Sequence, residues 1–329
     1  MEQRTLGRTH RPVSAIGLGT WQLGADWGEV SEEQALDVLA AATEAGVTLL
    51  DTADVYGDGR SERILGRFLR DHDGLTVATK MGRRVEQVPE NYRLDHFREW
   101  TDRSRRNLGV DVLDLVQLHC PPSATIDDDA TWDALDTLVA DGAVAAYGVS
   151  VETCDQALAA IARPGCASVQ IILNAFRPRA LDEVLPAARR AGVGILARVP
   201  LASGLLSGKY DETTTFAEDD HRHYNRDGSA FDVGETFAVV DYAIGVEAAL
   251  EFSALVRAHG PDGATPAQVA LAWCAQQEGV STVIPGARSP EQARANAAAG
   301  ELPALSPALL EGVRDLYDTR LREQVHTRW

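Results

Sequence analysis

The sequence predicts an α/β fold in which eight parallel strands form a (β/α)8 TIM barrel. Short apolar runs alternate with amphipathic stretches along the chain, eight runs are present, and each run is continuously apolar. Continuous apolar strands are typical of a parallel sheet covered by helices, and eight strands close such a barrel. We therefore expect residues 1–329 to form one barrel domain with an N-terminal hairpin and an extra C-terminal helix.

The hairpin and the first strands open this alternation. Residues 2–12 predict a hairpin that turns near Gly7 and covers the N-terminal end of the barrel. The eight strands are expected near residues 13–20, 47–52, 75–80, 113–119, 144–150, 168–174, 194–200 and 281–285.

Amphipathic stretches between the strands predict the helices. Ser31, with Glu33 and Gln34 close behind it, is typical of a helix N-terminus, and Gly46 is typical of a helix end. Gly109, Gly142 and Gly192 mark further helix ends. The helices are expected at Ser31–Ala45, Ser61–Asp71, 95–108, 130–141, 155–163 and 180–191, with Pro307–Arg322 as the extra outer helix.

A long polar segment, residues 201–245, interrupts the alternation after the seventh strand. A loop of this length on a compact scaffold is typically functional or disordered. Its His221 and His223 are only two residues apart in a polar loop, which is weak spacing for metal ligands, so we expect no metal.

The charge balance of the chain disfavours some classes of binding partner. The chain has 31 Lys and Arg against 49 Asp and Glu, a formal charge of −18. This surface repels nucleic acids and anionic membranes. No apolar run is long enough for a transmembrane helix. We also expect no signal peptide, because residues 1–4 do not lead into an apolar stretch with a small-residue cleavage site. The four cysteines (Cys120, Cys154, Cys166 and Cys274) lack paired spacing, so we expect a cytoplasmic protein with reduced thiols, of open oligomeric state.

Three successive strands end in residues that can do chemistry. Asp51, Lys80 and His119 each end an apolar run, and Tyr56 follows the first of these by a few residues. Active sites of (β/α)8 barrels lie at this C-terminal rim, and a buried charge there needs a partner. We therefore expect an Asp51–Lys80 ion pair beside Tyr56 and His119.

This set fits proton donation to a carbonyl group that accepts a hydride. An ammonium near Tyr56 favours the phenolate and lowers the pKa of the phenol, which makes it a usable proton donor. His119 can donate a hydrogen bond that orients the carbonyl oxygen. Cys120 follows His119 but is itself followed by two prolines, so it is expected to be a small wall residue rather than a nucleophile.

The chain resembles the aldo-keto reductase superfamily over nearly its whole length. No single motif is specific, but their order along the predicted strands is. The motifs are Gly17–Trp21, Asp51–Gly57, Ser61-Glu62, Thr79-Lys80, Leu118-His119, Tyr147–Ser150, Gln170, Asn174, Pro200–Tyr210, Ile284–Arg288 and Asn296.

The resemblance implies NADP(H) bound in an extended form without a Rossmann domain. It implies a catalytic tetrad of Tyr56 as general acid, Lys80 and Asp51 as tuning residues, and His119 as the group that orients the carbonyl. The substrate pocket would contain Trp21, Trp27, Tyr56 and His119. Cofactor contacts are implied for Gly19, Thr20, Trp21, Asp51, Ser150, Gln170, Asn174, Arg198, Pro200, Leu201, Ser203, Gly204, Leu206, Lys209, Gly286, Arg288, Gln292 and Asn296.

Two of these positions depart from the family pattern. Arg198 stands where many relatives have an aromatic residue under the nicotinamide, and its planar guanidinium can stack there instead. Gln292 replaces a basic residue that grips the 2′-phosphate, which leaves Arg288 and Lys209 as candidates for that role. We therefore expect NADP, with NAD as a possible second cofactor. A Rossmann fingerprint is excluded because Gln22 stands where its third glycine would be.

The function expected from these residues is NADPH-dependent reduction of an aldehyde or ketone. Two alternatives stay open. The same residues serve a sugar or secondary-alcohol dehydrogenase that runs oxidatively, and the chain is also similar to potassium-channel β subunits, which act as cofactor-sensing regulatory subunits. Those subunits carry an amide where this chain has His119.

Overall fold

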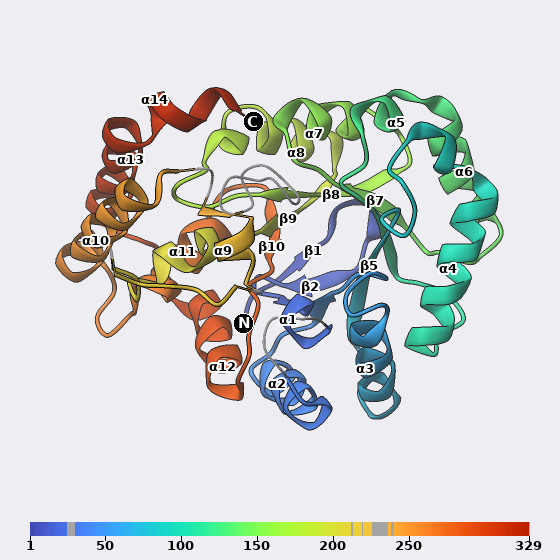
Figure 1. The fold of residues 1–329 in the computed structure, drawn as a ribbon, viewed down its shortest axis with the longest axis horizontal. Helices are drawn as coiled ribbons and strands as arrows, with labels where there is room; N and C mark the ends of the chain where they lie inside the picture. The colour runs from blue at the N-terminus through green and yellow to red at the C-terminus, as the bar shows by residue number, and fades with distance from the viewer. Residues whose placement is uncertain (25–29, 212, 219, 226–235, 238–239, 329) are drawn as a thin grey trace.

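The computed structural model describes residues 1–24, 30–211, 213–218, 220–225, 236–237 and 240–328. Its centre is a barrel of eight strands, each parallel to its neighbours in chain order (Figure 1). Parallel bridges from Ile16 to Val283 and from Gly19 to Gly286 close the first strand against the last. The predicted (β/α)8 fold is therefore confirmed. The barrel strands are β3 (Leu18–Gly19), β4 (Leu49–Asp51), β5 (Thr76–Met81), β6 (Leu115–His119), β7 (Tyr147–Ser150), β8 (Cys166–Ile172), β9 (Gly194–Arg198) and β10 (Val280–Val283).

Helices surround this barrel (Figure 1). Ser31 forms the predicted capping box, because its hydroxyl accepts from the Gln34 N–H while the Gln34 side chain accepts from the Ser31 N–H. None of the described helices is long and apolar enough to cross a membrane. The helices are α1 (Trp21–Gly24), α2 (Glu32–Glu44), α3 (Arg60–Phe68), α4 (Leu94–Leu108), α5 (Ser123–Asp127), α6 (Asp129–Ala140), α7 (Cys154–Ile161), α8 (Val184–Ala191), α9 (His221–Tyr224), α10 (Tyr242–His259), α11 (Pro266–Ala275), α12 (Pro290–Ala298), α13 (Pro307–Arg320) and α14 (Arg322–Val325).

The predicted hairpin closes the N-terminal end of the barrel. It consists of β1 (Gln3–Thr5) and β2 (Pro12–Ser14), paired antiparallel around a turn at Gly7–Thr9. The guanidinium of Arg8 donates to four backbone carbonyls, those of Arg163, Pro164, Cys166 and Ala191. These bonds fix the hairpin to the segments that enter β8 and β9.

Three predicted boundaries were wrong. The run 13–20 is not one strand, because Val13 and Ser14 belong to the hairpin and only Leu18–Gly19 pairs with β4. The continuous apolar run does not reveal this division, because Val13 of the hairpin is also buried. It packs in a cluster with residues of the barrel strands. The segment 201–245 is also shorter than predicted: Asp241 caps α10, which begins at Tyr242. The last predicted helix, Pro307–Arg322, ends at Arg320, and α14 follows it.

The inside of the barrel has an apolar lower layer and a polar upper layer. Side chains two residues apart on a strand face the same side. Leu49, Ala78 and Leu115 pack in one buried cluster with the hairpin residues Leu6 and Val13. Two residues further along the same three strands lie Asp51, Lys80 and Gln117, all buried. The hairpin therefore seals the apolar end, and the polar side chains face the C-terminal rim.

Candidate active site

Asp51 and Lys80 form the buried ion pair that the sequence predicts. Asp51 ends β4 and is 3% exposed, and Lys80 in β5 is 1% exposed. The Lys80 Nζ lies 2.5 Å from Asp51 Oδ1 and donates a second hydrogen bond to the Thr52 carbonyl, at 3.0 Å. Burial opposes the charge on Lys80, but Asp51 and the Tyr56 hydroxyl outweigh this effect and raise the lysine pKa. Lys80 is therefore an ammonium group at neutral pH.

The Tyr56 side chain contacts this ammonium group. Its hydroxyl shares a hydrogen bond with Lys80, whose Nζ is 5.3 Å from the centre of the Tyr56 ring. Tyr56 lies in the loop after β4, where Gly57 has a φ of +57° and a Cβ would be 1.7 Å from the Gly24 carbonyl oxygen. Only glycine fits at position 57 of this turn. The turn therefore sets the direction in which the Tyr56 side chain projects.

Two more rings meet Tyr56 at the rim. The Trp21 ring is stacked on it with centres 6.0 Å apart, and the His119 ring meets it edge-on at 6.0 Å. Tyr56 and Trp21 are both half-buried. The structure thus brings all four predicted tetrad residues together, with the imidazole ring edge-on to the phenol ring.

The backbone after His119 is held from a neighbouring loop. Arg83 Nε donates to the His119 carbonyl at 3.2 Å, and Gln87 Nε2 donates to the carbonyls of His119 and Cys120 at 3.0 Å each. Cys120 has a φ of 48°, which is uncommon for a residue other than glycine. The loop after β5 therefore fixes the direction in which His119 leaves its strand.

A chain of amides extends the site below the ion pair. Asp51 Oδ2 accepts from Gln170 Nε2 at 2.8 Å and from Gln117 Nε2 at 3.4 Å. The Ser150 hydroxyl donates to Gln170 Oε1 at 3.5 Å. The sequence does not single out Gln117, because it lies within a strand and not at its end. Alternation gives the missing signal, since Gln117 has the same parity as His119 on β6 and therefore faces the barrel interior.

Asn174 and Arg198 lie next to this group, after β8 and at the end of β9. The Asn174 amide donates to the Val199 carbonyl at 3.0 Å and accepts from the Phe176 N–H at 2.9 Å, so its side chain ties two loops together. Arg198 Nη2 donates to the Val151 carbonyl at 3.2 Å and lies 3.6 Å from Cys120 Sγ. Arg198 is therefore fixed beside the residue that follows His119.

The predicted pyrophosphate segment follows β9 as a tight turn. Ser203 and Gly204 have φ values of 56° and 98° inside the 3-10 helix Ala202–Ser207. Turns with successive left-handed residues can present backbone N–H groups to an anion. Pro200 and Leu206 are buried, Leu201 is half-buried, and Lys209 is exposed.

The predicted adenosine-phosphate segment follows β10 and opens α12. Ser289 caps this helix by accepting from the Gln292 N–H at 3.3 Å, and the Gln292 side chain accepts from the Arg288 N–H at 2.8 Å. Asn296 donates to the Gly286 carbonyl at 3.1 Å. Arg288 is exposed at this helix N-terminus, which favours anions.

Two of the predicted cofactor-binding residues contact neighbouring strands and loops of the barrel. One predicted pocket residue lies outside the described residues. The Thr20 hydroxyl donates to the Asp51 carbonyl at 2.9 Å and is 2.8 Å from the Ser61 hydroxyl, and Gly19 pairs with Asp51 between β3 and β4. Trp27 lies outside the described residues.

Two buried acids lie behind the tetrad. Glu62 accepts from the Thr79 hydroxyl at 2.7 Å and from the Asn107 amide at 2.8 Å. The N–H of Asp54 donates to the Lys80 carbonyl at 3.1 Å. Burial, followed by the nearby Glu62, raises the pKa of the Asp54 carboxyl to about 7. The loop that carries Tyr56 thus contains a buried carboxyl group whose pKa lies near neutral pH.

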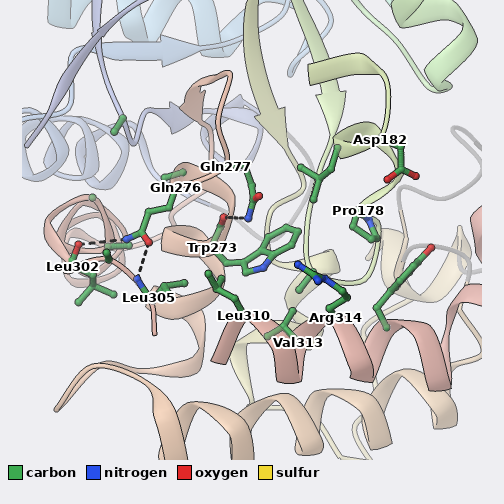
Figure 2. Close-up of a pocket in the computed structure, with 18 of the residues that line it drawn as sticks. Pro178, Asp182, Trp273, Gln276, Gln277, Leu302, Leu305, Leu310, Val313 and Arg314 are labelled. Atoms are coloured by element: carbon green, nitrogen blue, oxygen red, sulfur yellow. Dashed lines mark hydrogen bonds between the residues drawn. The ribbon is translucent and has the colours of Figure 1, made fainter. Parts of the chain in front are cut away.

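A separate cavity of about 820 Å³ lies on the outside of the barrel, between the segment after β8, α11 and α13 (Figure 2). None of the predicted site residues within the described part of the chain lines it. Its amides are occupied by local contacts: Gln276 accepts from the Leu305 N–H at 2.9 Å, and Gln277 donates to the Trp273 carbonyl at 2.8 Å (Figure 2). In the described part of the chain, no group of His, Cys, Asp and Glu side chains forms a metal site.

Comparisons with known proteins match nearly the whole chain. The profile of the Aldo/keto reductase family matches residues 15–318. A Mycobacterium tuberculosis protein named as an uncharacterized oxidoreductase is 35% identical over 298 residues, which cover 88% of this chain and 85% of that protein.

Solved structures agree with this match. The glycerol dehydrogenase AKR11B4 of Gluconobacter oxydans superimposes with a TM-score of 0.79 at 29% identity, covering 97% of this chain and 96% of its own. An aldo-keto reductase of Klebsiella pneumoniae, solved in complex with NADPH, has a TM-score of 0.72 at 25% identity, covering 98% and 99%.

Proposed function

The chain belongs to the aldo/keto reductase family and is an NAD(P)H-dependent oxidoreductase, and from this premise we propose that it reduces aldehyde or ketone carbonyls with NADPH. The observation that carries the proposal is the position of Lys80 Nζ, buried between the Asp51 carboxylate and the Tyr56 hydroxyl. A buried ammonium in this position has a chemical use, because it stabilises the phenolate that remains when Tyr56 gives up a proton.

The residues at the rim fit an extended dinucleotide. The turn Ala202–Ser207 and the capped N-terminus of α12 are both suited to phosphates. The exposed cations Lys209 and Arg288 are close to these two segments in the sequence of an otherwise acidic chain. The proposed contacts run from these segments to Ser150, Gln170 and Asn174 at the barrel mouth. The Klebsiella relative binds NADPH, which favours NADP over NAD.

When bound, NADPH supplies the hydride for the carbonyl carbon. The protein supplies the proton and the geometry. An imidazole N–H of His119 holds the carbonyl oxygen within reach of the Tyr56 hydroxyl, and Tyr56 donates its proton to that oxygen as negative charge develops there. Lys80 stabilises the resulting phenolate, and Asp51 keeps the ammonium in place.

The same groups serve the reverse reaction. Tyr56 then accepts the proton of an alcohol, and the phenolate form is favoured by Lys80. The relative with a TM-score of 0.79 is a glycerol dehydrogenase, so a small polyol with NADP⁺ is the oxidative substrate class to test. The ratio of the cofactor forms would set the direction.

The test compares wild type with Tyr56→Phe for NADPH oxidation on a panel of aldehydes and ketones, with NADH and the polyol reaction in parallel. We expect kcat/KM to fall roughly a hundredfold or more in Tyr56→Phe, the scale of general acid catalysis, with unchanged NADPH affinity. Tyr147→Phe is the matched control. Its hydroxyl contacts Asp136 at the opposite end of a barrel strand, so it should keep wild-type turnover.

Two outcomes would contradict the proposal. Wild-type turnover in Tyr56→Phe would remove Tyr56 from the proton step. Tight NADPH binding by a wild-type protein that reduces no member of the panel would favour the cofactor-sensing regulatory role instead.

A further inference from the structure

Gln117 is a buried amide in the middle of a barrel strand. It lies on β6 opposite Lys80 of β5 and has no exposed surface. Leu115, two residues earlier, belongs to the apolar interior layer. Burying an amide in such a place costs free energy unless its hydrogen bonds are made, so an apolar side chain would be the simpler filling here.

Both the donor and the acceptor end of the Gln117 amide have a hydrogen-bond partner within the site. Its Nε2 donates to Asp51 Oδ2 at 3.4 Å, and its Oε1 accepts from Gln170 Nε2 at 3.4 Å. Gln170 Nε2 also donates to Asp51 Oδ2, at 2.8 Å. The reverse orientation of the Gln117 amide would place an oxygen against a carboxylate oxygen, so the network fixes its orientation.

This arrangement divides the two oxygens of Asp51 between two kinds of partner. Oδ1 faces the Lys80 ammonium, and Oδ2 faces the two amides. The amides fix the rotation of the carboxylate and draw part of its charge away from Lys80. Gln170 is among the residues proposed to contact the nicotinamide, and that contact would leave Gln117 as the amide on Asp51.

We propose that Gln117 is a positioning residue that binds the Asp51 oxygen facing away from Lys80, limits how much of the carboxylate charge acts on Lys80, and thereby controls how strongly Lys80 acts on Tyr56. The inference deepens the proposed function and rests on it, because Tyr56 is the proton donor there. The effect of Gln117 on Tyr56 is electrostatic. Without the Gln117 donor, Asp51 places more of its charge on Lys80, and less of the ammonium field reaches the phenol.

The test is an ultraviolet titration of Tyr56 in the cofactor-free protein. Gln117→Leu and Gln117→Met are each compared with wild type, and every protein is paired with its own Tyr56→Phe variant so that the difference spectrum reports Tyr56 alone. We expect the Tyr56 phenol to ionise about half a unit to one unit higher in both Gln117 variants. In turnover, kcat should fall about three- to tenfold with unchanged KM and NADPH affinity.

Two controls separate this role from a general effect on the fold. Thr282→Val makes the same kind of change at another buried barrel position, opposite Leu196, and should leave the Tyr56 titration unchanged. In an Asp51→Asn background, Gln117→Leu should cause no further shift, because its effect acts through Asp51.

The outcomes keep the two proposals apart, because the titration needs neither cofactor nor substrate. An unchanged Tyr56 titration in both Gln117 variants, or an equal shift in the Asp51→Asn background, would overturn the role of Gln117 and leave the proposed function standing. A shift in a protein that reduces no carbonyl would support the coupling and overturn the proposed function.

Discussion

Asp54 is a buried carboxyl group in the loop that carries Tyr56, and its replacement by asparagine should remove a pH-dependent cost in stability. Its side chain has no exposed surface. Burial, then the neighbouring Glu62, raises its pKa from 3.8 to about 7. The folded state therefore holds this proton over a pH range in which the unfolded chain has lost it.

The sign of the pH dependence of stability follows from the difference between the folded and unfolded pKa values of Asp54. Stability from the protonated Asp54 is fully present below its unfolded pKa and is lost as pH rises through its folded pKa. A difference of about three pKa units corresponds to about 4 kcal/mol once both states are ionised. Asparagine keeps the shape without the charge. The gap in unfolding free energy between Asp54→Asn and wild type should therefore widen in favour of the variant by about 2–3 kcal/mol from about pH 5 to about pH 8.

The assay is urea unfolding of both proteins at several pH values in that range. Asp58→Asn is the matched control. Arg84 and Arg103 lower the pKa of this exposed carboxyl, so its contribution is lost only at more acidic pH and the control gap should stay flat. A gap between Asp54→Asn and wild type that is equally flat would refute the reasoning and show that Asp54 is ionised in the folded protein throughout.

Two further predictions concern the tetrad and its loop. Lys80→Met should abolish carbonyl reduction and lower the unfolding free energy by roughly 3–5 kcal/mol, because it leaves the Asp51 carboxylate buried without its ammonium partner. Turnover assays check the first effect and urea unfolding checks the second. Gly57→Ala should lower kcat far more than Gly74→Ala, because a Cβ at Gly57 would be 1.7 Å from the Gly24 carbonyl oxygen. Gly74 also has a positive φ (+79°), but a Cβ there would have no atom within 4 Å. Equal turnover in the two variants would contradict this steric argument.

Sequence patterns predicted this architecture well where each strand is followed by its own helix. The capping box at Ser31 and the left-handed Gly109 and Gly192 at helix ends depend on local backbone chemistry, which a sequence displays directly. The first strand was mistaken because Val13 and Leu18 are both buried apolar residues. Their different partners, the hairpin and β4, are set by tertiary contacts and not by composition.

The site was predictable to the same extent. Asp51, Lys80 and His119 were found because a charged or titratable group at the end of an apolar run stands out. Gln117 did not stand out, because a neutral amide carries no such contrast and its partners come from other strands. The sequence also does not encode where Gln170 bonds, since that depends on the barrel bringing β4 and β8 within reach across the interior.

The layered barrel interior explains why these polar residues can be buried in one place. On β4, β5 and β6, each polar residue of the upper layer follows an apolar residue of the lower layer by two positions, so one strand face serves both layers. The hairpin closes the lower layer, with Arg8 bonded to four carbonyls, and Tyr56, Trp21 and His119 line the upper rim. Charge at Asp51 is therefore compensated from within the barrel, by Lys80 and two amides, and Lys80 contacts the phenol at the rim. A change at Gln117, which lies below the rim, should for this reason alter proton donation at Tyr56 without touching a substrate.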